Sequence, residues 1–229
     1  DGTVVRVATA GVSVDDAGCD PGDLASCGGL VVTAAAGENW DDLAARAVAE
    51  GWIGIEALAG IPGAVGATPM QNVGAYGQEV AQTIWTVRTY DRHRRRIRTF
   101  ANAECGFAYR SSVFKGDDRY VVLAVSYQLL QGDLGAPVRY AELARTLGVQ
   151  IGERAKLTEV RDAVLELRRG KGMVLDEADH DTWSAGSFFT NPVLDEAAAA
   201  RLPVGAPRWP AGDGRVKTSA AWLIEHAGF

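Results

Sequence analysis

The chain has 229 residues, of which 47% are hydrophobic, and a formal net charge of −6 at pH 7. This length allows one large domain or two smaller ones with real cores, and the negative charge argues against a general nucleic-acid binder. No apolar run is long enough to cross a membrane. Cys19, Cys27 and Cys105 lack Cys-x-x-Cys spacing, so they indicate neither a disulfide framework nor a thiolate metal site. A reducing cytoplasm is the simplest compartment.

The first half of the chain predicts strands and one well-defined helix. β-Branched or apolar runs at 4–9 and 30–35 predict two strands separated by a polar, glycine-rich loop. Apolar residues then recur at helical spacing from Trp40 to Val48, with Asn39 as the expected N-cap and Gly51 as the stop. Further along, 84–90 and 96–100 predict two strands joined by a turn.

The second half predicts one more strand and two helices. Residues 120–130 form a strong strand pattern, and Thr158 is expected to cap a helix that ends at Gly170. A last helix is expected over 218–226. Because strands come mostly in hairpins or meanders with few helices between them, the pattern favours an α+β fold over a doubly wound parallel sheet. The polar, irregular stretch 171–183 is the expected domain boundary.

The segment 60–77, GIPGAVGATPMQNVGAYG, is the most informative about function. Glycine lets the main chain approach a ligand closely, so this run suggests peptide N–H groups lining a bound group, with a phosphate-bearing cofactor as the obvious candidate. Its Gly-x-x-Gly-x-x-Gly spacing matches neither the dinucleotide fingerprint nor a phosphate loop. The alternative is a structural loop with several tight turns. Asn72 and Tyr76 favour a ligand, since both offer directional hydrogen bonds beside exposed backbone.

A second polar cluster, 109–115, reads YRSSVFK and contains Arg110. A guanidinium can clamp a carboxylate or a phosphate through two parallel hydrogen bonds, which lysine cannot reproduce. The alternative is an arginine that solvates a loop or pairs with Asp117 or Asp118.

A third cluster, 185–192, reads AGSFFTNP. With no adjacent histidine base, Ser187 is not expected to be a nucleophile, although a positioned proton donor remains open. The alternative is a turn whose paired phenylalanines anchor a core. Lys171 and Lys217 could supply positive charge for an anionic ligand, while solvated lysines are the default.

Other charged residues indicate no further site. The arginine-rich run 92–98 falls in a predicted hairpin turn and is expected to be solvated rather than to bind nucleic acid. The three histidines are far apart and lack His-x-x-x-His spacing, so no metal is expected.

Four ordered blocks resemble the UDP-N-acetylenolpyruvoylglucosamine reductase family of flavoenzymes, which acts in bacterial peptidoglycan synthesis. They are the glycine-rich segment, AECGFAYRSSVFK, AGSFFTNPV and VKTSAAWLIEHAGF, and the resemblance covers nearly the whole chain. It implies an FAD-binding domain of the vanillyl-alcohol-oxidase (PCMH) type at 1–180, followed by a smaller α+β substrate-binding domain at 181–229. In this family NADPH reduces the flavin, and the enolpyruvyl sugar nucleotide then takes a hydride at C3 and a proton at C2, giving UDP-N-acetylmuramate.

The resemblance also implies roles for individual residues. Ser187 is similar to the family's proton donor, and Arg110 to the arginine that polarises the substrate carboxylate. The implied substrate contacts are Tyr76, Tyr140, Lys171, Asn191, Trp209 and Lys217, with tryptophan at 209 where relatives often have tyrosine. The implied cofactor-binding residues are Gly60, Ile61, Pro62, Gly63, Gly66, Ala67, Asn72, Gly74, Ala75, Tyr109 and Arg110.

Two departures from the family pattern shape the remaining expectations. Relatives open with another glycine-rich flavin segment and continue to a C-terminal glutamate that works with the arginine, and Glu225 is not at that position. Truncation at both ends is therefore expected. The alternatives to the reductase are an FAD-dependent alcohol or sugar oxidase of the same fold, or a non-catalytic binding remnant. A monomer is expected by default, with no nucleic-acid or membrane partner.

Overall fold

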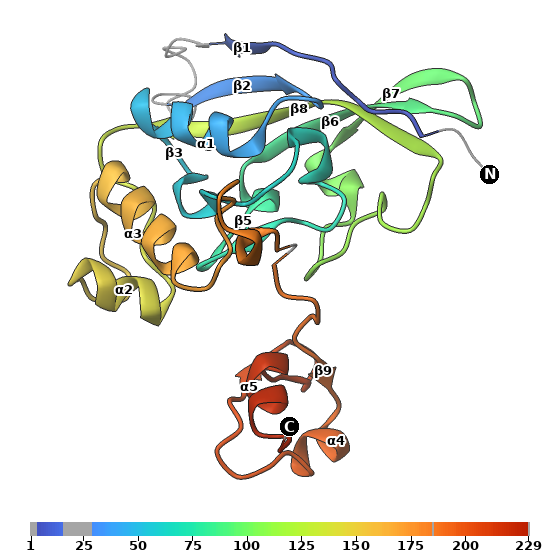
Figure 1. The fold of residues 1–229 in the computed structure, drawn as a ribbon. Coiled ribbons are helices and arrows are strands. Elements are labelled where there is room, and N and C mark those ends of the chain that lie inside the picture. Colours follow the sequence, from blue (N-terminus) through green and yellow to red (C-terminus); the bar gives the residue numbers. More distant parts are fainter. Residues whose placement is uncertain (1–3, 16–28, 185, 229) are drawn as a thin grey trace, which may run out of the picture. The chain divides into compact units, whose positions relative to one another are not determined.

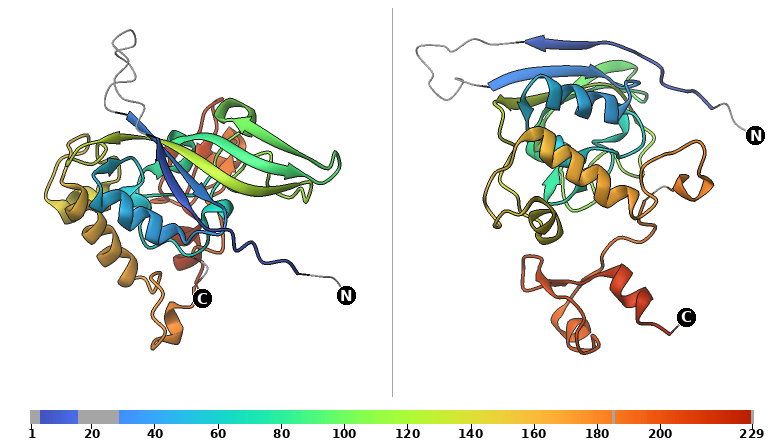
Figure 2. Two further views of the ribbon diagram at one scale, coloured as in Figure 1. Left: turned by 90° about the horizontal axis from the view of Figure 1, so that it is seen from above. Right: turned by 60° about the vertical axis from the view of Figure 1, so that its left-hand side comes forward.

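The structure, a computed structural model, describes residues 4–15, 29–184 and 186–228. Figure 1 shows the ribbon and Figure 2 gives two further views. The chain divides into two compact units, of which the first ends at Ser184 and the second begins at Ala185. The expected boundary at 180/181 lies four residues earlier. The roles expected of the two units, cofactor binding and substrate binding, remain predictions.

The first unit is built on one antiparallel sheet with the strand order β1-β2-β8-β6-β7, and β3 also pairs with β8. A separate two-stranded ribbon joins β4 and β5. The strands are β1 (Val12–Asp15), β2 (Gly29–Ala35), β3 (Trp52–Ile53), β4 (Gly74–Ala75), β5 (Gln78–Glu79), β6 (Ile84–Asp91), β7 (Arg96–Ala101) and β8 (Tyr120–Gln131).

Helices α1 and α3 lie on one face of this sheet (Figures 1 and 2). The core between the sheet and α1 includes Val32, Trp40, Val87, Val125 and Tyr127, each at most 1% exposed, whereas α3 packs with α2 in a second cluster. The helices of this unit are α1 (Trp40–Ala49), α2 (Ala141–Leu147) and α3 (Leu157–Arg169), with 3₁₀ turns at Glu56–Leu58, Val65–Ala67, Val80–Gln82, Asn102–Cys105 and His180–Thr182. The expected α+β class is confirmed.

The second unit contains a small antiparallel sheet of order β10-β11-β9 and two short helices. Its elements are β9 (Val193–Leu194), α4 (Glu196–Ala200), β10 (Trp209–Pro210), β11 (Val216–Lys217) and α5 (Ala220–Glu225).

Most sequence-predicted elements are present, including the helix capped by Asn39, whose side chain accepts from the amides of Asp41 and Asp42. The strand predicted at 4–9 is wrong, because no strand forms there and Val4 and Val5 are 94% and 78% exposed. β-Branched residues favour a strand only where a neighbouring strand packs against them. Thr158 does not cap α3, which begins one residue before it with Lys156 as N-cap.

The final helix is shorter than predicted, because Ser219 caps it and Thr218 instead donates its hydroxyl to the carbonyl of Pro207 at 2.7 Å. Helices α2 and α4 were not predicted from the sequence. Cys19 and Cys27 lie outside the described residues. Cys105 is buried, and burial raises the pKa of its thiol to about 12.

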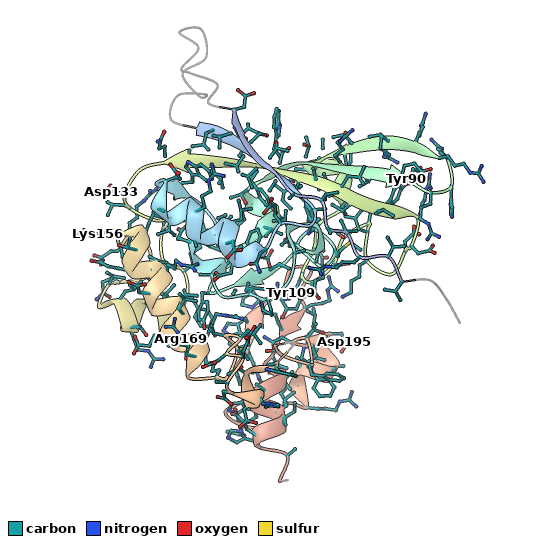
Figure 3. The ribbon with its side chains drawn as sticks, turned by 45° about the horizontal axis from the view of Figure 1, so that its top comes forward. Tyr90, Tyr109, Asp133, Lys156, Arg169 and Asp195 are labelled. Atoms are coloured by element: carbon teal, nitrogen blue, oxygen red, sulfur yellow. The ribbon has the colours of Figure 1, made fainter. Side chains whose placement is uncertain are left out.

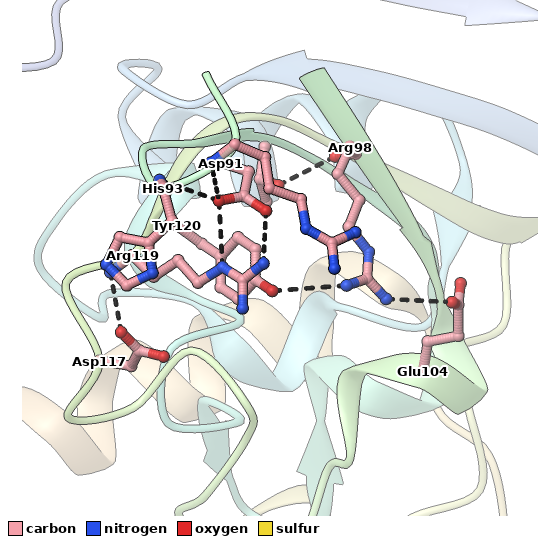
Figure 4. Close-up of polar contacts among 9 residues, drawn as sticks. Asp91, His93, Arg98, Glu104, Asp117, Arg119 and Tyr120 are labelled. Atoms are coloured by element: carbon pink, nitrogen blue, oxygen red, sulfur yellow. Dashed lines mark hydrogen bonds and ion pairs between the residues drawn. The ribbon is translucent and has the colours of Figure 1, made fainter. Parts of the chain in front are cut away.

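The arginine-rich turn between β6 and β7 is fixed by Asp91 (Figure 4). Arg119 donates to both oxygens of this carboxylate, at 3.0 and 2.7 Å, and the amides of His93 and Arg94 donate to Oδ1. The hydrogen bonds from Arg119 hold the pKa of Asp91 well below its usual range. Arg92 pairs with the exposed Asp118. These contacts within the protein account for the charged residues Asp91, Arg92 and Arg119 at the turn.

Asp41 connects α1 to α3 and to the glycine-rich segment. Its carboxylate accepts two hydrogen bonds from Arg161, at 2.8 and 2.9 Å, and one from the amide of Gly60 at 2.6 Å. Burial raises the pKa of Asp41, but the hydrogen bonds from Arg161 and Gly60 outweigh it and leave the pKa lowered. The ionised form of the Asp41 carboxylate is therefore more stable, relative to the protonated form, in the folded state than in the unfolded state.

We expect Asp41→Asn to destabilise the first unit at pH 7 by about 1.5–3 kcal/mol, the scale of hydrogen bonds to a charged group. Because the folded pKa is lowered, this stabilisation is present above the unfolded pKa, about 3.9, and is lost as pH falls through the folded value. Urea unfolding between pH 3 and 7 measures it. Asp162→Asn, an exposed change one residue from Arg161, should leave the profile unchanged. Equal pH profiles for Asp41→Asn and the parent would contradict the prediction.

Candidate functional site

The glycine-rich segment packs against the end of β2 and the start of α1. The amide of Gly66 donates to the carbonyl of Ala36, and that of Val65 donates to Glu38, both at 2.9 Å. A Cβ on Gly66 would lie 2.6 Å from the Cβ of Ala36, so this contact requires glycine. With the Gly60 amide bonded to Asp41, several main-chain donors of the segment already have protein acceptors. The amides of Gly60, Val65 and Gly66 are therefore not available to line a bound group.

The first turn of the segment is exposed. Pro62 and Gly63 are exposed, and a Cβ on Gly63 would meet nothing within 4 Å. Ala67 is also exposed, whereas Gly60 is buried and its carbonyl accepts from Nε of Arg168 at 3.2 Å. A ligand can therefore approach the main chain at 62–63 and at Ala67, but not at Gly60.

Arg110 brings the second cluster onto the end of the glycine-rich segment. Its guanidinium donates from Nη1 to the carbonyl of Asn72 at 3.1 Å and from Nη2 to that of Gly74. Arg110 lies with Tyr109 at the tip of a two-residue turn, closed by mutual hydrogen bonds between Ala108 and Ser111. The alternative in which Arg110 pairs with Asp117 or Asp118 is wrong, since these residues interact with Arg119 and Arg92. Figure 3 labels Tyr109 in this unit.

The side chain of Asn72 completes the junction between the glycine-rich segment and the 109–115 cluster. This residue is 1% exposed, and its Nδ2 donates to Glu79 Oε2 at 2.8 Å and to the carbonyl of Ala108 at 3.1 Å. Its Oδ1 accepts from the amide of Ala81. Glu79 Oε1 also lies 3.9 Å from Nη1 of Arg110. The two clusters, far apart in sequence, therefore form one hydrogen-bonded unit.

Three of the expected site residues have left-handed backbone conformations. Among the described residues, five non-glycine residues have positive φ, including Asn72 at 48°, Tyr76 at 48° and Arg110 at 51°. Such conformations are uncommon outside glycine and persist only where the surrounding contacts hold them. Their concentration at this junction supports a functional site there.

A neighbouring cluster joins three expected substrate contacts. The rings of Tyr76 and Tyr140 meet edge to face, with centroids 5.5 Å apart, and Nζ of Lys171 lies 5.9 Å from the Tyr76 centroid. Lys171 also donates to both oxygens of Glu142, at 3.0 and 2.8 Å. Burial lowers the pKa of Lys171, but the hydrogen bond with Glu142 outweighs it and raises the pKa overall. Lys171 is therefore a positive charge beside two aromatic rings.

The second unit brings two of its four expected residues, Trp209 and Lys217, together. Trp209 and Lys217 are directly opposite each other on β10 and β11, with Nζ of Lys217 5.9 Å from the indole centroid. Asn191 caps the start of α5 through the amide of Ala220 at 3.0 Å. Ser187 is exposed, and the next two residues, Phe188 and Phe189, are 92% and 59% exposed. The alternative in which these phenylalanines anchor a core is therefore wrong.

Glu79 and Glu142 are functional candidates that the sequence did not single out. Each is an ordinary glutamate in a polar stretch, and its importance depends on a partner distant in sequence. For Glu142, its place two residues after Tyr140 was the available signal. Within the described ranges no group of three or more His, Cys, Asp and Glu side chains could hold a metal ion. None of the described helices is long and apolar enough to cross a membrane.

We expect Gly74→Ala to disturb this junction. The new Cβ would lie 2.7 Å from Cγ of Glu79, 2.8 Å from the carbonyl oxygen of Gln78 and 2.9 Å from Nη1 of Arg110. Overpacking of this kind costs about 1–3 kcal/mol, measurable as a lower urea midpoint. Gly170→Ala is the control, because its Cβ would meet only ordinary contacts at 3.7 Å. An unchanged midpoint for Gly74→Ala would mean that the junction adapts freely.

Comparisons with known proteins find similar sequences along the whole chain. A family model described as an FAD binding domain matches residues 2–92. Reductases named UDP-N-acetylenolpyruvoylglucosamine reductase are 57% identical in Cutibacterium acnes over 100% of this chain, and 60% identical in Thermobifida fusca over 85%. The one from Salinispora arenicola is 54% identical over 100% of the chain. Together, these matches confirm the FAD-binding fold class expected from the sequence.

A solved structure of the UDP-N-acetylenolpyruvylglucosamine reductase MurB from Thermus caldophilus is 25% identical over 69% of this chain and 47% of its own, with a TM-score of 0.47. The curated relatives are matched over 58%, 57% and 62% of their own lengths, so the chain spans about three fifths of them. By its sequence, the chain is similar along its length to these UDP-N-acetylenolpyruvoylglucosamine reductases.

Proposed function

We propose that this protein acts as an FAD- and NADPH-dependent reductase that converts the enolpyruvyl group of a UDP-N-acetylglucosamine derivative into the lactyl group of UDP-N-acetylmuramate. The observation that carries the proposal is the placement of Arg110 against the main chain of Asn72 and Gly74, inside a chain that matches this family throughout. We further propose that the protein is a monomer in the cytoplasm and that its reaction is a step of peptidoglycan synthesis.

The first unit has features that fit a flavin nucleotide. The main chain at 62–63 is exposed, and Gly63 leaves open space where a side chain would stand. FAD, when bound, would carry the hydride from NADPH to C3 of the enolpyruvyl group. Ile61, Pro62 and Gly63 are proposed to contact FAD from the first turn, and Gly66 and Ala67 from the 3₁₀ turn that follows. Gly60 is buried, and its carbonyl accepts from Arg168, so it supports the turn without contacting FAD. Contacts with FAD from the junction are proposed for Asn72, Gly74, Ala75, Tyr109 and Arg110.

Arg110 is proposed to bind the substrate carboxylate. Hydride addition at C3 places negative charge on C2 and on the carboxylate conjugated with it. A guanidinium has five N–H donors, and the contacts with Asn72 and Gly74 use one bond on each of two nitrogens. The remaining donors can bind a carboxylate. Because the main-chain contacts fix the guanidinium before the substrate arrives, charge that develops in the transition state meets a preorganised partner.

Ser187 is proposed to deliver the proton to C2. Its exposed position leaves the hydroxyl accessible to substrate. A serine hydroxyl is a weak acid, so it donates its proton effectively only when C2 of the substrate has gained carbanion character.

The remaining contacts suit a nucleotide diphosphate. Tyr76, Tyr140 and Lys171 combine aromatic faces with a cation in the first unit, and Trp209 with Lys217 repeats that combination in the second. Cations address the diphosphate, while aromatic faces stack on the base or pack against the sugar. The side-chain oxygen of Asn191 already accepts a hydrogen bond from the first amide of α5, so its side-chain N–H₂ is the group proposed to donate to a ligand.

The intact gene product should carry a yellow flavin whose absorbance is bleached by NADPH without oxygen. Addition of the enolpyruvyl sugar nucleotide should restore the absorbance, because the substrate accepts the hydride. Stopped-flow spectroscopy at the flavin band measures both steps. Reoxidation by oxygen alone, with no response to the sugar nucleotide, would support an oxidase instead.

We expect Ser187→Ala to lower the rate of reoxidation by substrate by about a hundredfold or more, the usual scale of lost general-acid help. Reduction of the flavin by NADPH should be unchanged, since no proton from Ser187 is needed there. Thr190→Ala, an exposed hydroxyl removed three residues away, is the matched control. Equal slowing of both half-reactions would argue against Ser187 as the proton donor.

A further inference from the structure

We infer that Glu79 is a positioning residue for Arg110, holding the guanidinium in its binding orientation; this inference rests on the proposed role of Arg110 at the flavin site. Among the described residues, Glu79 is the carboxylate in ion-pair contact with Arg110, with 3.9 Å between Oε1 and Nη1. The distance is long for a direct hydrogen bond, so Glu79 acts on Arg110 mainly through charge and through shared partners.

The shared partner is Asn72. Glu79 Oε2 accepts from Nδ2 of Asn72 at 2.8 Å, while the main-chain carbonyl of the same residue accepts from Arg110 at 3.1 Å. Nδ2 of Asn72 also donates to Ala108, at the base of the turn that carries Arg110. The contacts thus form a closed ring through Glu79, Asn72 and Arg110. Movement of the Glu79 carboxylate therefore disturbs its contacts with both Asn72 and Arg110.

The backbone is adapted to bring these groups together. Asn72 and Arg110 both have positive φ, and a side chain on Gly74 would overlap Cγ of Glu79 and Nη1 of Arg110. Glu79 follows the β4–β5 turn, where Gly74 pairs directly with it. The side chains of Glu79 and Arg110 are 36% and 26% exposed, so their attraction is only partly screened by solvent. A ligand that covers the junction strengthens that attraction further.

The same carboxylate also sets what Arg110 can bind. Two of the acceptors that Arg110 faces are neutral carbonyls, and Glu79 is the anionic one. If Glu79 paired fully with Arg110, it would compete with a substrate carboxylate. At 3.9 Å the carboxylate orients the guanidinium without occupying its donors, which remain for the ligand.

The test is a double-mutant cycle on FAD affinity, measured by quenching of flavin fluorescence in the intact gene product without NADPH or substrate. Glu79→Gln keeps an acceptor for Asn72 but removes the charge, and should raise the dissociation constant about fivefold, within the usual range of coupling between contacting residues. In the Arg110→Gln background the same change should alter the dissociation constant less than about twofold, because its effect passes through Arg110.

Glu104→Gln is the matched control. Glu104 accepts a hydrogen bond from the main-chain amide of Ala101 at 2.8 Å and, like Glu79, contacts an arginine, Arg98 at 3.4 Å, so it tests the general effect of such a neutralisation. It should leave FAD affinity unchanged. If Glu79→Gln does not fold, Glu79→Asp replaces it, since the charge is then withdrawn by one methylene and the same non-additivity is expected.

An unchanged affinity for Glu79→Gln would overturn the inference, as would a fivefold effect that simply multiplies with that of Arg110→Gln. A protein that binds FAD with the expected coupling but fails to reduce the enolpyruvyl sugar would contradict the proposed reductase and leave the role of Glu79 in place. No FAD binding by the parent protein would contradict both.

Discussion

The pairing of β8 with β2 on one side and with β6 on the other is the constraint on which the first unit depends. These two ladders run almost the whole length of β8 and hold the central sheet together. Tyr127, in the middle of β8, is fully buried, and its hydroxyl shares a 2.9 Å hydrogen bond with Thr68 in the glycine-rich segment. Burial raises the pKa of Tyr127, so the phenol stays protonated as the segment's partner.

From that anchor the segment is held at both ends by charged groups. Asp41 binds the amide of Gly60 at one end, and Arg110 binds the carbonyls of Asn72 and Gly74 at the other. Such interactions are about twice as strong as neutral hydrogen bonds, which explains how a loop with little regular structure keeps a defined path. The strained conformations of Asn72 and Arg110 are supported by the same contacts.

The sequence predicted the regular elements because their signals are local. Asn39 caps α1 through its own neighbours, and the alternation in 84–90 and 96–100 is a property of each strand alone. The strand predicted at 4–9 was wrong for the complementary reason, since a strand requires a neighbour that this pattern cannot report. The junction is also beyond local reasoning. Arg110 lies 38 residues from Asn72, and nothing in either segment specifies that a guanidinium meets a main-chain carbonyl.

The proposed chemistry divides between the two compact units, with Arg110 in the first and Ser187 in the second. Each unit also carries a lysine beside an aromatic ring, Lys171 with Tyr76 and Lys217 with Trp209. Each pair offers a cation and an aromatic face, the combination that suits a nucleotide diphosphate. Binding energy from the remote nucleotide can be used to hold the enolpyruvyl group in the orientation that the reaction requires. Under the proposed function, this requirement explains why a small reacting group is presented on a large, diphosphate-bearing substrate.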